Sequence, residues 1–220
     1  MKRILLVLAL ALCIFTPGQN NAFAATFTFT PSPVELNGLA HQNYYTWGIN
    51  WGIPTGEIIS EATLTFKNIY NWQLAEDGNI LFTHLLDSPQ TGSREITDDN
   101  SGTGGDKFTV AGFWSDQILV GAWIDTLGGS ARNFDLVYNF RQLGLLDDLT
   151  DFANTSAPAG RANFGLGFDP DCHYWNSGIQ FDITTRKLPD NPPVPEPATM
   201  TLLGMGLAGI LLKTRKKVRA

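Results

Sequence analysis

The chain has 220 residues, with 15 Lys and Arg against 21 Asp and Glu. Seven of the basic residues lie among the first three and last eight positions, so residues 25–194 keep 8 basic against 20 acidic residues, a net charge near −12. A surface of this charge repels nucleic-acid phosphates and anionic lipid, which argues against a polyanion-binding protein, and it attracts divalent cations.

The first 24 residues have the pattern of a secretory signal peptide. Lys2-Arg3 precedes an apolar stretch from Ile4 to Phe15, and Ala22-Phe23-Ala24 supplies small residues where signal peptidase needs them. We expect signal peptidase to cleave after Ala24. An alternative lipoprotein signal would use Cys13, but the residue before it is not small. The sequence therefore predicts an exported protein.

The body that follows, residues 25–187, is predicted to be one domain of short strands. Segments of alternating or continuous apolar character lie between clusters of Gly, Pro, Asn and Asp, as is typical of antiparallel sheets with one wet face. The predicted strands cover residues 26–30, 44–51, 61–67, 80–86, 107–113, 117–124, 134–140, 162–168 and 179–185.

Little helix accompanies these strands. Only residues 143–154 space their apolar side chains for a helix of two to three turns. Many short strands with so little helix predict an all-β fold, an antiparallel β-sandwich of jelly-roll type in which two sheets cover each other's apolar faces.

Two loops carry oxygen-rich side chains of the kind that Ca²⁺ binds. The first, residues 97–106, contains Asp98, Asp99 and Asp106, although it does not match an EF-hand. We predict calcium there as an alternative to a solvated turn.

The second loop, residues 165–178, holds the densest mixture of functional groups in the body. Asp169, Asp171 and Asn176 predict a calcium site, with a purely structural turn as the alternative. Cys172 and His173 suit zinc, but a structural zinc site needs about four ligands and only His41 and His84 are available elsewhere. Cys172 is also the only thiol outside the signal peptide, which excludes an intramolecular disulfide.

Six tryptophans offer flat aromatic surfaces for sugar rings. Those near predicted strand ends are the candidate carbohydrate-binding residues: Trp47, Trp51, Trp72 and Trp175. Trp114 and Trp123 are expected in the core, and core packing is the alternative for the other four as well.

Catalytic signatures are weak. The sequence has no Gly-x-Ser-x-Gly elbow, no His-Glu-x-x-His helix, no phosphate-binding Gly-Lys-Ser/Thr loop and no second thiol in the body. We therefore expect no enzyme and assign no catalytic residue. A glycoside-active enzyme stays open, because it needs only two suitably spaced carboxylates.

The C-terminus has three consecutive parts. A Pro-rich linker over residues 188–194 leads to Pro195-Glu196-Pro197, then to an apolar run from Ala198 to Leu212, and finally to five cations within residues 213–219. A helix of about 15 residues is roughly 22 Å long, short for a hydrocarbon core of about 30 Å. The cations place the tail on the cytoplasmic side and the body outside.

This C-terminal segment resembles the PEP-CTERM sorting signal of exported Gram-negative proteins, which a membrane enzyme called exosortase recognises. The resemblance implies that the tail, residues 195–220, anchors the protein in the membrane, is cut near the motif, and leaves the body released or attached to the cell surface, often among extracellular polysaccharide. An uncleaved membrane anchor is the alternative. The run Asp169-Pro-Asp-Cys-His173 also resembles a motif of exported PEP-CTERM proteins of unknown function.

We therefore expect a noncatalytic protein with a structural role at the cell surface or in the extracellular matrix. Its expected partners are signal peptidase and an exosortase-type enzyme, with no nucleic acid. A carbohydrate-binding module for extracellular polysaccharide is the alternative function.

Overall fold

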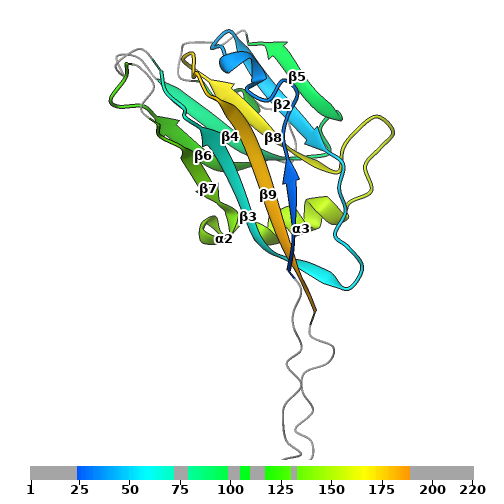
Figure 1. Cartoon of the computed structure of the whole chain (residues 1–220). Helices are drawn as coiled ribbons and strands as arrows, with labels where there is room; N and C mark the ends of the chain where they lie inside the picture. Colours follow the sequence, from blue (N-terminus) through cyan, green and yellow to red (C-terminus); the bar gives the residue numbers. More distant parts are fainter. Residues whose placement is uncertain (1–23, 72–78, 99–104, 110–116, 130–132, 189–220) are drawn as a thin grey trace, which may run out of the picture. The chain divides into compact units, whose positions relative to one another are not determined.

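The computed structural model describes residues 24–71, 79–98, 105–109, 117–129 and 133–188 (Figure 1). Most of the regular structure in these residues is β-strand. The strands are β1 (Ala24–Phe29), β2 (Asn43–Ile49), β3 (Glu57–Lys67), β4 (Ile80–Asp87), β5 (Gly92–Thr97), β6 (Gln117–Ile124), β7 (Leu136–Asn139), β8 (Phe164–Pro170) and β9 (Gly178–Lys187). The helices are the 3₁₀ turns η1 (Leu36–Gly38) and η2 (Lys107–Thr109) and the α-helices α2 (Phe140–Leu143) and α3 (Leu146–Asn154).

The strands form two antiparallel sheets. One has the order β1-β9-β3-β7, and the other has the order β5-β2-β8-β4-β6. The two sheets pack face to face, since Phe66 of β3 contacts Phe168 of β8 with ring centroids 5.3 Å apart. The predicted antiparallel β-sandwich is therefore confirmed at the level of two packed sheets.

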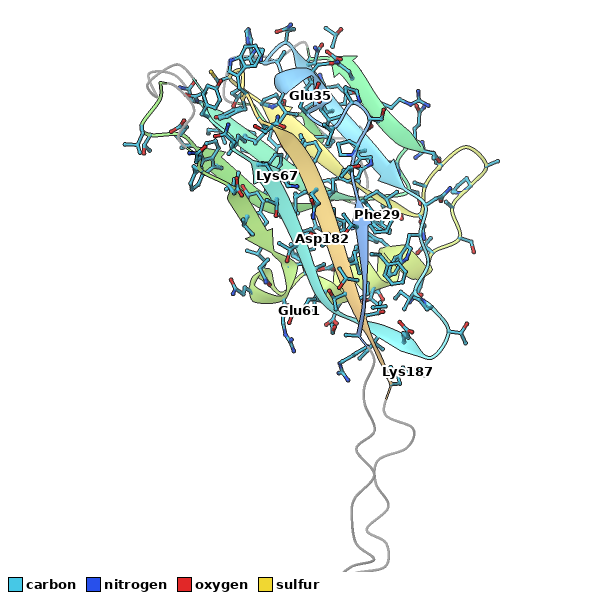
Figure 2. The ribbon with its side chains drawn as sticks, viewed as in Figure 1. Phe29, Glu35, Glu61, Lys67, Asp182 and Lys187 are labelled. Atoms are coloured by element: carbon cyan, nitrogen blue, oxygen red, sulfur yellow. The ribbon has the colours of Figure 1, made fainter. Side chains whose placement is uncertain are left out.

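The core follows from alternation along β3 and β9. Apolar side chains at every second position point inward, and polar ones point out. On the outer face, Thr28 of β1 donates to Asp182 of β9, and Lys67 donates to Gln180 (Figure 2). The central inward-facing residues are Ala62, Leu64, Phe66, Ile179, Phe181, Ile183, Phe164, Leu166 and Phe168, all at most 1% exposed.

Strand β8 is buried on both faces, because η2 covers its outer side. A Cβ at Gly167 would lie 2.5 Å from the Phe108 ring, so glycine at this position is what lets Phe108 lie directly on the sheet. Phe108 forms a second apolar cluster with Tyr44 and Leu86.

The predicted elements agree with the structure except in three places. The strand predicted over 107–113 is wrong at its start, where residues 107–109 form η2, and its remainder lies outside the described residues. Strand β5 was not predicted. The helix predicted over 143–154 corresponds to α3, which begins at Leu146; the short helix α2 before it was not predicted and ends at Gly144, whose φ is 76°.

The described chain begins and ends at the same end of the sandwich. Ala24 pairs with Arg186, whereas Lys67 pairs with Gly178 at the opposite end. Figure 2 shows Lys187 and Glu35 at these two ends. We call the end that carries Glu35 the loop end. It is formed by the loops around η1, between β3 and β4, between β6 and β7, and between β8 and β9.

The predicted signal peptide, sorting motif and membrane segment over 198–212 lie outside the described residues, apart from Ala24. Within the part of the chain that the structure describes, no helix is long and apolar enough to cross a bilayer.

Candidate functional site

Four carboxylates from the two predicted calcium loops meet at the loop end. We call Asp98, Asp106, Asp169 and Asp171 the acidic cluster. Asp98 follows β5, Asp106 precedes η2, and Asp169 and Asp171 lie at the end of β8. Because β5, β2, β8 and β4 are successive neighbours in one sheet, loops distant in sequence come together here.

Internal partners bind much of this cluster. The buried Asp169 accepts a hydrogen bond from the Lys107 backbone N–H at 2.6 Å. The Lys107 ammonium lies 3.6 Å from the Asp98 carboxylate, and His84 Nε2 lies 2.9 Å from Asp106 Oδ2. The cluster thus contains its own cationic side chain.

Asp169 is the most perturbed member of the acidic cluster. Burial raises the pKa of its carboxyl to about 7, and the nearby charges of Asp98, Asp171 and Asp106 act in the same direction. The Lys107 N–H bond acts the other way without overcoming burial. A neutral carboxyl is therefore favoured below about pH 7.

The structure brings together only part of each predicted calcium set. Asn176 serves the β8–β9 turn instead, because it donates to the Glu35 carbonyl at 3.1 Å and accepts from Gly178 N at 3.0 Å. Asp99 lies outside the described residues. Among the residues that the structure describes, no group of three or more His, Cys, Asp or Glu side chains is arranged to hold a metal ion. Calcium binding stays a prediction.

Of the groups considered for zinc, Cys172, His173 and His84 each have other contacts. Cys172 is 8% exposed, and burial raises the pKa of its thiol, which keeps it neutral. The His173 ring stacks on Trp175 with centroids 4.0 Å apart, while His84 contacts Asp106. Within the described residues these groups form no metal-binding cluster, and zinc binding stays a prediction.

The candidate tryptophans differ in exposure. Trp47 is only 4% exposed and lies in the core, so it presents no face to a sugar ring. Trp51 is half-buried, with its ring 5.1 Å from that of Phe27. Trp72 lies outside the described residues, and Trp175 is 43% exposed at the loop end.

An aromatic site around Trp123 was not predicted from the sequence. Trp123, expected in the core, borders a cavity of about 350 Å³ at the loop end. Its ring stacks on Phe134 with centroids 5.8 Å apart and an interplanar angle of 20°. We call this space the aromatic cavity. Its lining residues are Ile69, Tyr70, Trp123, Ile124, Asp125, Thr126, Leu127 and Phe134.

Asp125 holds the walls of the aromatic cavity together. Its Oδ2 accepts from Asn71 N at 3.2 Å, and its Oδ1 accepts from Leu127 N at 3.1 Å and Gly128 N at 3.3 Å. One buried carboxylate therefore joins the loop after β3 to the loop after β6.

We expect Asp125→Ala to lower the free energy of unfolding by about 2 kcal/mol, because backbone N–H groups would lose a charged acceptor. Chemical denaturation monitored by circular dichroism measures this. Asp151→Ala is the matched control, since it removes an exposed carboxylate from α3 and should change stability by less than about 0.5 kcal/mol. Equal stability of the two variants would show that the Asp125 bonds contribute nothing.

Comparison with known proteins identifies the C-terminal segment. Residues 193–216 match the family model of the PEP-CTERM protein-sorting motif, which confirms the prediction made on Pro195-Glu196-Pro197. The motif indicates an exported protein that exosortase sorts at the cell envelope. It covers none of the β-sandwich.

The other comparisons with known proteins indicate no function for the β-sandwich. No curated protein matches the chain. Among solved structures, the chain is similar to one described as "The Structure of Tomato Aspermy Virus by X-Ray Crystallography", at 8% identity over 89% of this chain and 100% of that chain, with a TM-score of 0.31. A similarity at this TM-score supports no inference about function.

Proposed function

We propose that this protein is a noncatalytic β-sandwich with a structural role at the cell surface or in the extracellular matrix. The observation that carries the proposal is the pairing of Ala24 with Arg186, which puts the first and last strands of the described domain together at one end of the sandwich. The sorting motif begins a few residues after β9, so an attachment made through it would join the domain at the end of the sandwich opposite the loop end.

The connectivity of the two sheets supports a jelly roll. Apart from β5, the chain follows the interlocked order β1-β9-β3-β7 opposite β2-β8-β4-β6, as two Greek keys require, and β5 extends the second sheet at its edge. This fold serves many binding and structural proteins, so it names no activity.

The carboxylates at the loop end support a noncatalytic role. Glycoside cleavage needs two carboxylates facing one substrate. Of the described residues that line the aromatic cavity, Asp125 alone carries a carboxylate, and both its oxygens accept backbone hydrogen bonds. Asp106 and Asp169 also accept backbone hydrogen bonds. These bonds stabilise turns and connect separate loops.

The proposal is tested by the intact mass of the protein recovered from the membrane, surface and medium fractions of its native host. We expect a chain that starts at Ala25 and ends near Pro195, found in the surface or medium fraction. A chain that ends at Ala220 and stays in the membrane fraction would show a plain membrane-anchored protein and would contradict surface or matrix display.

Binding of extracellular polysaccharide is the second candidate function. It is favoured by the aromatic side chains that the loop end exposes, Trp175 at 43% and Phe134 at 45%. A passive structural protein needs no exposed aromatic rings, whereas a glycan-binding domain needs them. Retention of the purified protein on immobilised polysaccharide distinguishes the two.

A further inference from the structure

Three apolar side chains around the aromatic cavity are exposed to solvent, and their exposure does not stabilise the folded domain. Leu127 is 70% exposed, Phe134 is 45% exposed and Ile124 is 43% exposed, and all three line the same cavity. Scattered exposed apolar residues are normal on a protein surface, but a contiguous group around a hollow marks a binding site.

The walls of the cavity are held in place before any ligand arrives. The Trp123 ring contacts Phe134, at 5.8 Å and nearly parallel, and the fully buried Tyr174, at 5.5 Å. The Phe134 carbonyl accepts from Ile69 N at 2.9 Å, which joins the loop before β7 to the loop after β3. Asp125 adds a second connection between loops. A preformed site loses little conformational entropy when it binds.

Size and charge restrict the occupant. A volume of about 350 Å³ falls at the small end of the range for small-ligand sites. The acidic body repels anions, which disfavours phosphorylated or acidic ligands.

We propose that the aromatic cavity binds one neutral pyranose unit of a glycan. The apolar C–H face of the sugar ring packs on the exposed ring of Phe134, which stacks on Trp123, and a sugar hydroxyl group bonds to the hydroxyl group of Thr126 at the same cavity. This assignment rests on the polysaccharide-binding candidate above and names its site, which differs from the predicted Trp175 platform.

The test measures binding of neutral oligosaccharides to the full chain purified in detergent. Cellohexaose, xylohexaose, mannohexaose, maltohexaose and laminarihexaose are titrated while tryptophan fluorescence and calorimetry are recorded. We expect at least one to bind, and we expect Phe134→Ala to weaken that binding about tenfold or more, because the variant removes the exposed ring of the stack.

Two further variants keep the test independent of folding. Thr126→Val removes a hydroxyl from an exposed side chain and should weaken binding about threefold to tenfold without changing Tm. Trp175→Ala removes an exposed aromatic ring at the loop end that does not line the cavity, and it should leave binding unchanged.

The proposal is overturned if none of the oligosaccharides binds, if Phe134→Ala and Thr126→Val both bind as well as the wild type, or if binding is lost only in Trp175→Ala. The last result would move the glycan site to Trp175. None of these outcomes affects surface display, which the fractionation experiment tests separately.

Discussion

Replacing Asp169 with Asn is expected to raise the free energy of unfolding at pH 8 by a few kcal/mol. Asp169 is fully buried, and its pKa of about 7 in the folded protein exceeds the value near 3.9 expected in the unfolded chain. Above pH 7 the folded protein must carry a buried charge beside three other carboxylates. Asn has the same shape, stays neutral and keeps an oxygen to accept the Lys107 N–H.

The sign of the pH dependence follows from the raised pKa. Since the folded state holds the proton more tightly, the stabilisation from Asp169 is full below about pH 4 and is lost as the pH rises through 7. The loss is on the order of 4 kcal/mol, from a shift of about three pKa units at 1.36 kcal/mol each. The wild type should therefore lose stability across this range relative to Asp169→Asn, and the two proteins should be equal near pH 4.

Urea denaturation from pH 4 to pH 8 in the presence of a calcium chelator measures this difference. Comparing the two proteins at each pH cancels most of the titration of neighbouring groups, which are Asp98, Asp106, Asp171, Lys107 and His84. Asp151→Asn, at an exposed site on α3, is the matched control and should follow the wild type at every pH. Parallel curves for the wild type and Asp169→Asn would show that Asp169 titrates normally.

The alternation of apolar and polar residues predicted the strands that have one buried face and one solvent-exposed face. In β3, the inward series Ala62, Leu64 and Phe66 was visible in the sequence because polar residues separate its members. The same criterion missed β5, whose residues are mostly exposed, since this strand is fixed by backbone pairing with β2 at a sheet edge. It also predicted a strand at residues 107–113, because the sequence does not show that Phe108 packs over Gly167.

The sequence indicated residues of the candidate sites, but it did not show which of them lie together in the fold. The sequence indicated both acidic loops, but their meeting depends on the order β5-β2-β8-β4, which no local pattern encodes. The aromatic cavity was missed for a related reason. Trp123 stands at the end of a predicted strand and was assigned to the core; it does pack against the core, but its ring also stacks on Phe134 and borders the cavity. The signal that was present is the apolar residue Leu127 in a polar turn.

Trp47→Ala and Trp175→Ala should differ strongly in how much they lower stability, although the sequence presents the two residues as equivalent candidates. Trp47 is 4% exposed within the main core, so its truncation leaves a large cavity and should cost about 3 to 5 kcal/mol. For a domain of this size the expected fall in Tm is roughly 10 °C. Trp175 is 43% exposed, and its loss should cost less than about 1 kcal/mol.

Differential scanning calorimetry of the wild type and both variants measures these changes, and the neutral-oligosaccharide titration is repeated on each folded protein. Because Trp47 contributes packing and presents no face to solvent, any Trp47→Ala protein that folds should bind glycan as the wild type does. A Trp47→Ala protein that keeps its Tm but loses glycan binding would mean that the side chain is accessible in solution. In that case the two sheets would have to separate near β2, which their packed aromatic core opposes.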